Sequence, residues 1–112
     1  MESSPVERRG ELGDVPLACV AEAIPEGERA AHFALIARLF GERPRQKAAL
    51  ADGYEYQFDD EDFRDIARFV ENERRCCPFL TFSIEVTPDS GVRLRLLGPP
   101  RTREFLDMEL SG

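Results

Sequence analysis

Apolar residues recur at intervals of three and four in three parts of the chain, and this spacing predicts three amphipathic helices. The first is expected over residues 25–40, because Pro25 suits a first helical turn, and the second over 59–75, before Pro78 stops it. A third helix can form over 101–110. Their expected core positions are Phe33, Ile36, Ala37 and Phe40, then Phe63, Ile66, Phe69 and Val70, and finally Phe105, Leu106 and Leu110.

Alternating apolar and polar residues predict two β-hairpins, 47–50 with 54–58 and 80–86 with 92–96. Asp52-Gly53 is typical of a tight hairpin turn with a positive backbone dihedral. The order of the elements predicts an α+β fold, an antiparallel sheet of about four strands with the helices packed on one face. The other face would carry Glu55, Gln57, Thr81, Ser83, Glu85, Arg93 and Arg95.

The chain of 112 residues has the size of one ordinary domain. Residues 1–14 are polar and have no apolar period, so we expect a disordered tail followed by a single α+β domain over 15–112. No apolar run approaches the roughly 20 residues that span a bilayer, and the start lacks the signal-peptide pattern. We therefore expect a cytoplasmic protein without a membrane partner.

The net charge of −7 disfavours nucleic acid as a partner, because the phosphate backbone would be repelled. The chain also lacks a Walker loop, a dinucleotide fingerprint, a paired-histidine metal motif and a nucleophile elbow. These absences argue against the common nucleotide-dependent and hydrolytic enzymes. We assign no catalytic and no cofactor-binding residues from the sequence.

Three cysteines are the best candidates for chemistry in this chain. Cys76 and Cys77 are adjacent at the end of the second predicted helix, and Cys19 lies far upstream. An odd number of cysteines in a reducing cytosol favours free thiols, a metal site or a redox site over a disulfide framework.

A soft metal or metalloid ion is our preferred ligand for Cys19, Cys76 and Cys77. Three thiolates suit Cu(I), Hg(II) or arsenite, and the ion itself would hold the sulfurs deprotonated. Zinc is less favoured, because adjacent cysteines rarely supply two of its ligands. His32 and Glu73 are further donors to consider, although such residues more often serve packing or surface ion pairs.

Two alternatives remain open. In the first, the cysteines are buried structural residues of a noncatalytic interaction module, expected to form a homodimer through the open sheet face. In the second, the protein is a thiol-dependent redox enzyme. The second is disfavoured because the negative end of a helix raises the pKa of a thiol, and adjacent cysteines form only a strained disulfide ring.

The motif Glu-Arg-x-Cys-Cys-Pro-Phe-Leu-x-Phe at residues 73–82 resembles that of a family of small uncharacterised bacterial proteins. The pattern continues in 94–99 and 104–106, and Cys19 and residues 52–58 belong to it. The resemblance implies a family built around these thiols, and it implies no particular activity.

Overall fold

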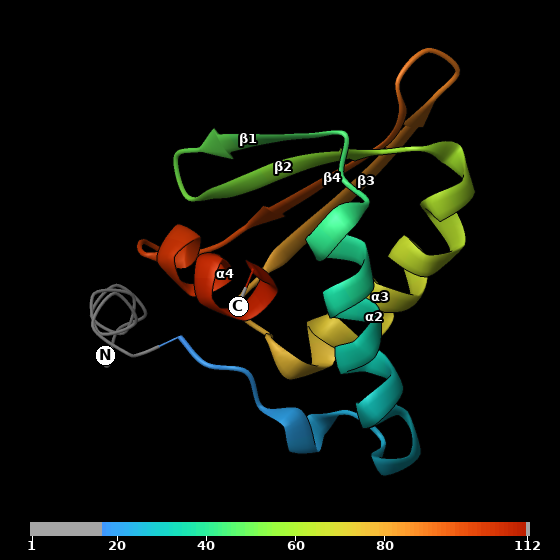
Figure 1. The fold of residues 1–112 in the computed structure, drawn as a ribbon. Helices are drawn as coiled ribbons and strands as arrows, with labels where there is room; N and C mark the ends of the chain where they lie inside the picture. The colour runs from blue at the N-terminus through green and yellow to red at the C-terminus, as the bar shows by residue number, and fades with distance from the viewer. Residues whose placement is uncertain (1–16, 112) are drawn as a thin grey trace.

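The computed structural model describes residues 17–111, so the tail expected over residues 1–14 lies outside the described part of the chain. Among the described helices, none combines the length and the apolar character needed to cross a bilayer. Each predicted helix and strand is present close to its expected bounds. Figure 1 shows, in chain order, the short 3-10 turns η1 (Ala21–Ala23) and η2 (Glu26–Glu28), α2 (Arg29–Glu42), β1 (Gln46–Leu50), β2 (Gly53–Phe58), η3 (Asp60–Asp62), α3 (Phe63–Cys76), β3 (Thr81–Thr87), β4 (Gly91–Leu97) and α4 (Thr102–Ser111).

The four strands form one antiparallel sheet in the order β1-β2-β4-β3. Each hairpin pairs its own strands, and β2 joins β4 so that Tyr56 lies opposite Leu94, which in turn lies opposite Ile84. The three helices lie on one side of this sheet (Figure 1). The predicted α+β fold, with an antiparallel sheet and helices on one face, is therefore confirmed.

The first hairpin needs its glycine for a reason that differs from the expected one. Among the described glycines only Gly91, in the second hairpin, has a positive φ, of 70°. Gly53 instead lies so close to β4 that an added Cβ would collide with the carbonyl oxygen of Leu96. Glycine is required at this turn because a neighbouring strand passes close to it, and the expected positive dihedral is wrong.

The buried faces of the helices are rotated from those expected. In α2 the side chains of His32 and Leu35 are buried, whereas Phe33 is 41% exposed. Phe63 of α3 is 45% exposed, so its assignment to the core is also wrong. Because α2 packs against both α3 and α4, its buried face is wider than one stripe and includes a histidine. The buried apolar residues are Ile24, Leu35, Ile36, Leu39, Tyr56, Phe58, Ile66, Phe69, Cys76, Cys77, Leu80, Val92, Leu94, Leu96, Leu106 and Leu110.

The opposite face of the sheet carries ion pairs between neighbouring strands. Arg93 lies 2.8 Å from Glu85 and 3.4 Å from Glu55, and Arg95 lies 2.7 Å from Glu55. The charged side chains of this face thus pair with one another across β2, β4 and β3. The homodimer expected through this face stays a prediction.

Candidate metal centre

The end of α3 directs two adjacent cysteines to one side. Cys76 is the last residue of the helix, and the N–H of Cys77 closes the final turn by donating to the carbonyl oxygen of Glu73 at 2.7 Å. Cys77 then leaves helical geometry, with φ −124° and ψ 75°. Pro78 follows, and Leu80 donates to the Cys77 carbonyl oxygen at 3.1 Å, so the chain turns sharply into β3. This break in the helix lets neighbouring side chains share one site.

Cys19 joins the pair from the segment before η1. The N–H of Val20 donates to the carbonyl oxygen of Cys76 at 2.8 Å, which fixes this segment against the end of α3. The expected approach of Cys19 to the pair is confirmed. Cys19 and Cys76 form a disulfide with their Cα atoms 5.0 Å apart, and only Cys77 is a free cysteine. The expectation of free thiols is therefore wrong for Cys19 and Cys76 in this structure.

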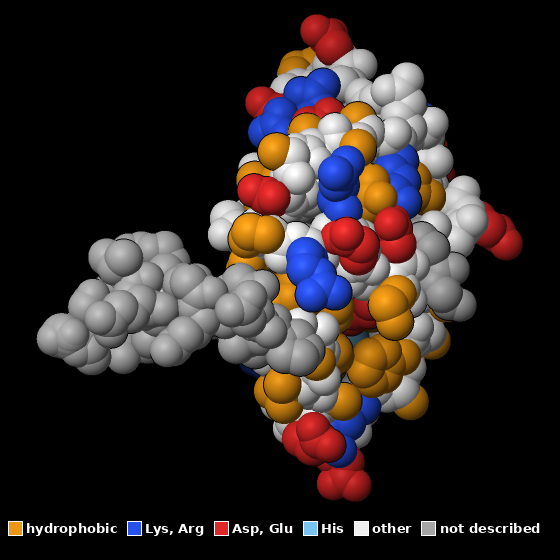
Figure 2. All heavy atoms as spheres, turned by 90° about the vertical axis from the view of Figure 1, so that its left-hand side faces the viewer, with side chains coloured by type: hydrophobic (Ala, Val, Ile, Leu, Met, Phe, Trp, Pro, Cys, Tyr) orange, Lys and Arg blue, Asp and Glu red, His pale blue; other side chains and the backbone are white. Residues whose placement is uncertain are grey.

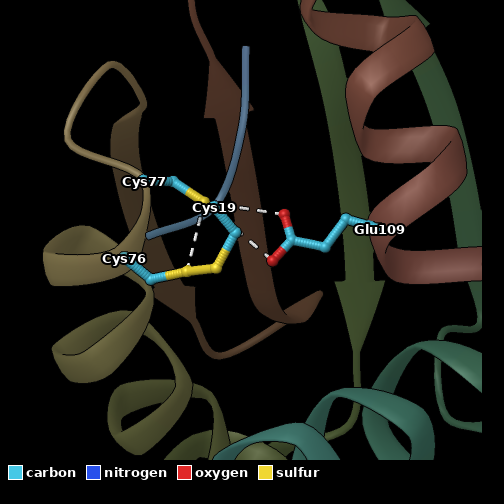
Figure 3. A group of neighbouring side chains, drawn as sticks. All are labelled: Cys19, Cys76, Cys77 and Glu109. Carbon is cyan, nitrogen blue, oxygen red and sulfur yellow. Dashed lines mark hydrogen bonds between the residues drawn. A yellow bond between two sulfur atoms is a disulfide. The ribbon is translucent and has the colours of Figure 1, made fainter. Parts of the chain in front are cut away.

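Glu109 of α4 completes a group of four donor residues. One ligand atom from each of Cys19, Cys76, Cys77 and Glu109 can be chosen so that all four lie within 4.8 Å of one another. The Cys77 sulfur lies 3.8 Å from that of Cys76 and 3.6 Å and 3.9 Å from the two Glu109 oxygens (Figure 3). Once the disulfide is reduced, three sulfurs and a carboxylate at these positions could hold a metal ion.

The sequence reasoning did not single out Glu109. The only signal was its position beside Leu110 and three residues after Leu106, which places a carboxylate at the border of the inward face of α4. That position is common for solvated glutamates. What makes Glu109 a donor is the packing of α4 on α2 and β2, which brings Glu109 beside Cys77 and which the local pattern does not contain.

His32 and Glu73, the two further candidate donors, bind each other behind the sulfurs. Both side chains are fully buried, and His32 Nε2 lies 2.9 Å from Glu73 Oε1. The other oxygen of Glu73 accepts a hydrogen bond from the Cys77 thiol at 3.3 Å. The His32 ring stacks on Phe69 with centroids 6.0 Å apart. The pair therefore lies outside the group of four and supports Cys77 from the core side.

Negative charge accumulates at this site. Burial raises the pKa of the Cys77 thiol, and the nearby Glu73 and Glu109 carboxylates raise it further. Burial also raises the pKa of Glu109 to about 8, with a further contribution from Glu73. The arginine next to the cysteines in sequence, Arg75, is bound elsewhere, donating to Asn72 at 2.7 Å. These shifts favour the protonated forms of the Cys77 thiol and the Glu109 carboxyl group.

A cavity of about 460 Å³ adjoins the donor group. Two donors, Cys19 and Glu109, belong to its wall, so the cavity opens directly onto the site. Figure 2 shows the side of the molecule on which α4 lies in Figure 1, and orange apolar side chains stand there beside red carboxylates. The other residues of the wall are Leu17, Pro100, Arg101, Glu104, Phe105 and Met108.

Comparison of the chain with protein-family models, curated proteins and solved structures gives no match. The resemblance to a family of small bacterial proteins therefore stays a prediction. The chemistry of this centre has to be inferred from its own geometry.

Proposed function

We propose that the reduced protein binds a soft metal or metalloid ion through Cys19, Cys76 and Cys77, with Glu109 as a fourth donor. The observation that carries this proposal is the convergence of three sulfurs and one carboxylate within 4.8 Å. They come from three separate parts of the chain. Sequestration, delivery or sensing of the ion would all use the same site.

The donor set favours soft ions. Thiolates select Cu(I), Hg(II) and trivalent arsenic, and these ions accept low coordination numbers. Glu109 also supplies the fourth donor that a tetrahedral zinc site needs, so zinc belongs among the ions to test. The adjacency of Cys76 and Cys77 still counts against zinc, whose cysteine ligands are usually separated by two to four residues.

The electrostatics favour a cation over a reactive thiol. A nucleophilic cysteine needs nearby positive charge to lower its pKa, whereas the pKa of Cys77 is raised by burial and two carboxylates. A bound cation would reverse this effect and displace the protons of the thiols. The site is thus better suited to hold a positive charge than to attack a substrate.

The disulfide and the ion compete for the same sulfurs. With Cys19 and Cys76 joined, only Cys77 and Glu109 keep free donor atoms. Two equivalents of a small thiol would restore the site. The two small-thiol molecules become joined in a new disulfide, and the Cys19–Cys76 disulfide becomes two thiols. In the cytoplasm, where the sequence leads us to expect this protein, thiol reductants would keep the site open.

Equilibrium dialysis of the reduced protein against Hg(II), Cu(I), arsenite and Zn(II) tests the proposal. We expect one ion per chain, protection of all three thiols from alkylation, and loss of binding in Cys77→Ser. Glu109→Gln should weaken binding, whereas Glu104→Gln, on an exposed position of the same helix, should not. Equal alkylation of the three thiols with and without each ion would contradict the proposal.

A thiol redox site is the second candidate, and the Cys19–Cys76 disulfide is the observation that favours it. Cys77, with its sulfur 3.8 Å from that of Cys76, is the neighbouring thiol. Alkylation of the reduced protein as a function of pH separates the two candidates. A redox enzyme would have one thiol that reacts well below neutral pH, and the ion site would have none.

A further inference from the structure

The cavity beside the donor group is too large to serve a bare ion. A water molecule takes up about 30 Å³ in the liquid, and sites for small organic ligands measure about 300–1,000 Å³. At about 460 Å³ the cavity falls in the second range. An ion bound by the three sulfurs would leave most of this space to water.

The wall of the cavity is suited to an apolar group. Leu17, Pro100, Phe105 and Met108 contribute carbon surface, and Arg101 and Glu104 add polar groups. Because Cys19 and Glu109 also belong to the wall, a ligand in the cavity would lie directly beside Cys19, and the other two sulfurs lie behind it.

The wall is held in place independently of any ligand. The Phe105 ring packs edge to face on Phe79, with ring centroids 5.0 Å apart. At the start of α4 the buried Thr102 hydroxyl donates to the carbonyl oxygen of Pro99 at 2.6 Å. A cavity with fixed walls binds a ligand without having to order them first.

We infer that the cavity holds the organic group of a monosubstituted trivalent arsenical, R–As(OH)₂, in which R is apolar and about the size of a phenyl ring. This inference rests on the proposed function and specifies its ligand. The arsenic binds Cys19, which lines the cavity, and Cys76, its disulfide partner, and R points away from them into the cavity.

The reaction needs no oxidant or reductant once the disulfide is reduced. Two As–S bonds form, while two As–O bonds and two S–H bonds break. The two hydroxyl groups leave as water with the thiol protons, and arsenic stays trivalent. Inorganic arsenite would use the third sulfur in place of R and would leave the cavity empty.

The test compares phenylarsonous acid with methylarsonous acid, which form the same two bonds to sulfur. Each is titrated into the reduced full-length protein in competition with dithiothreitol, a dithiol that has no cavity. The measured quantity is the ratio of the affinity for phenylarsonous acid to that for methylarsonous acid, the phenyl-to-methyl ratio. We expect this ratio to be about tenfold higher for the protein than for dithiothreitol, because the ring removes more apolar surface from water when it enters the cavity. An equal preference in protein and dithiothreitol would overturn the inference.

Met108 offers a variant with little risk to folding, since its side chain is 78% exposed. Met108→Glu should reduce the phenyl-to-methyl ratio about tenfold toward the value for dithiothreitol, while the matched control Met108→Leu should keep it. Any effect of the new charge on the thiols cancels in this ratio. An unchanged ratio in Met108→Glu would also overturn the inference.

Inorganic arsenite distinguishes a failure of the cavity inference from a failure of the proposed function. If the reduced protein binds arsenite but shows no preference for phenyl, the proposed function stands and the inference about the cavity fails. If it binds neither arsenite nor either organic arsenical, arsenic is not a ligand and the inference fails. In that case the dialysis with the other ions decides the proposed function.

Discussion

The two ends of α3 differ in how their charges are balanced. At the first turn, Asp62 lies 2.8 Å and Glu61 2.9 Å from the guanidinium of Arg43, and Asp59 lies 3.3 Å from Arg45. Carboxylates are also favoured there, because the start of a helix carries partial positive charge. Each of these three carboxylates has a basic partner within the chain.

At the other end acidic groups gather around Cys77, although Arg74 and Arg75 also lie in the last turn of the helix. The last turn of a helix carries partial negative charge, and Glu73, Cys77 and Glu109 add acidic groups to it. The difference explains why we place the ion at this end. The carboxylates before the first turn of α3 pair with arginines, whereas among the described residues no arginine or lysine forms an ion pair with Glu109, and the Cys77 thiol faces two carboxylates.

The largest effect that we expect is stabilisation of the reduced protein by its ion. At an ion concentration about 1,000 times the Kd, the free energy of unfolding should rise by about 4 kcal/mol. Thermal denaturation with and without the ion measures this. Arg43→Gln, at the balanced end, should keep the full gain, and Cys77→Ser should lose it. A gain of similar size in Cys77→Ser would place the ion elsewhere.

Loss of the disulfide should have the next largest effect. The bond joins residues 57 positions apart, so reduction without an added ion should lower the free energy of unfolding by about 2–4 kcal/mol, toward the upper end of this range for a loop of this length. Urea denaturation with and without dithiothreitol measures the change. Cys19→Ser should be as stable as the reduced protein. Equal stability of the oxidised and reduced protein would show that the bond does not hold the segment before η1.

The pH dependence of stability should reveal the imbalance at the end of α3. The pKa of Glu109 is raised from its ordinary value near 4.5 to about 8, so the folded protein keeps a proton that the unfolded chain releases. The contribution of Glu109 to stability is therefore complete below about pH 4.5 and is lost as the pH rises toward 8. Urea denaturation across this range should show a smaller decline in Glu109→Gln. The control Glu104→Gln should show the full decline in stability. An equally large decline in Glu109→Gln would show that a group other than Glu109 causes it.

The smallest effect concerns the balanced end of α3. Arg43→Gln removes the partner of the nearly buried Asp62, so the midpoint of urea denaturation should fall, by less than on loss of the disulfide. The affinity for the ion should not change. A change in that affinity would show that the two ends of α3 are coupled.

Much of the fold could be predicted from local patterns. The helices, both hairpins and the break at Pro78 depend on residues within a few positions of one another. The faces of the helices were predicted less well, since Phe33 and Phe63 are exposed while His32 is buried. Which face a helix buries depends on how many neighbours it packs against, and periodicity does not contain that number.

The sequence by itself determined that two cysteines stand at the end of a helix and that a third could reach them. The tertiary structure alone decided that Cys19 is bonded to Cys76, that Glu109 joins the sulfurs across 32 positions, and that His32 and Glu73 meet across 41. Spacing along a helix or strand follows from backbone geometry within one element. Contacts between remote segments arise only when those segments share a core, so the donor group is a property of the packed molecule.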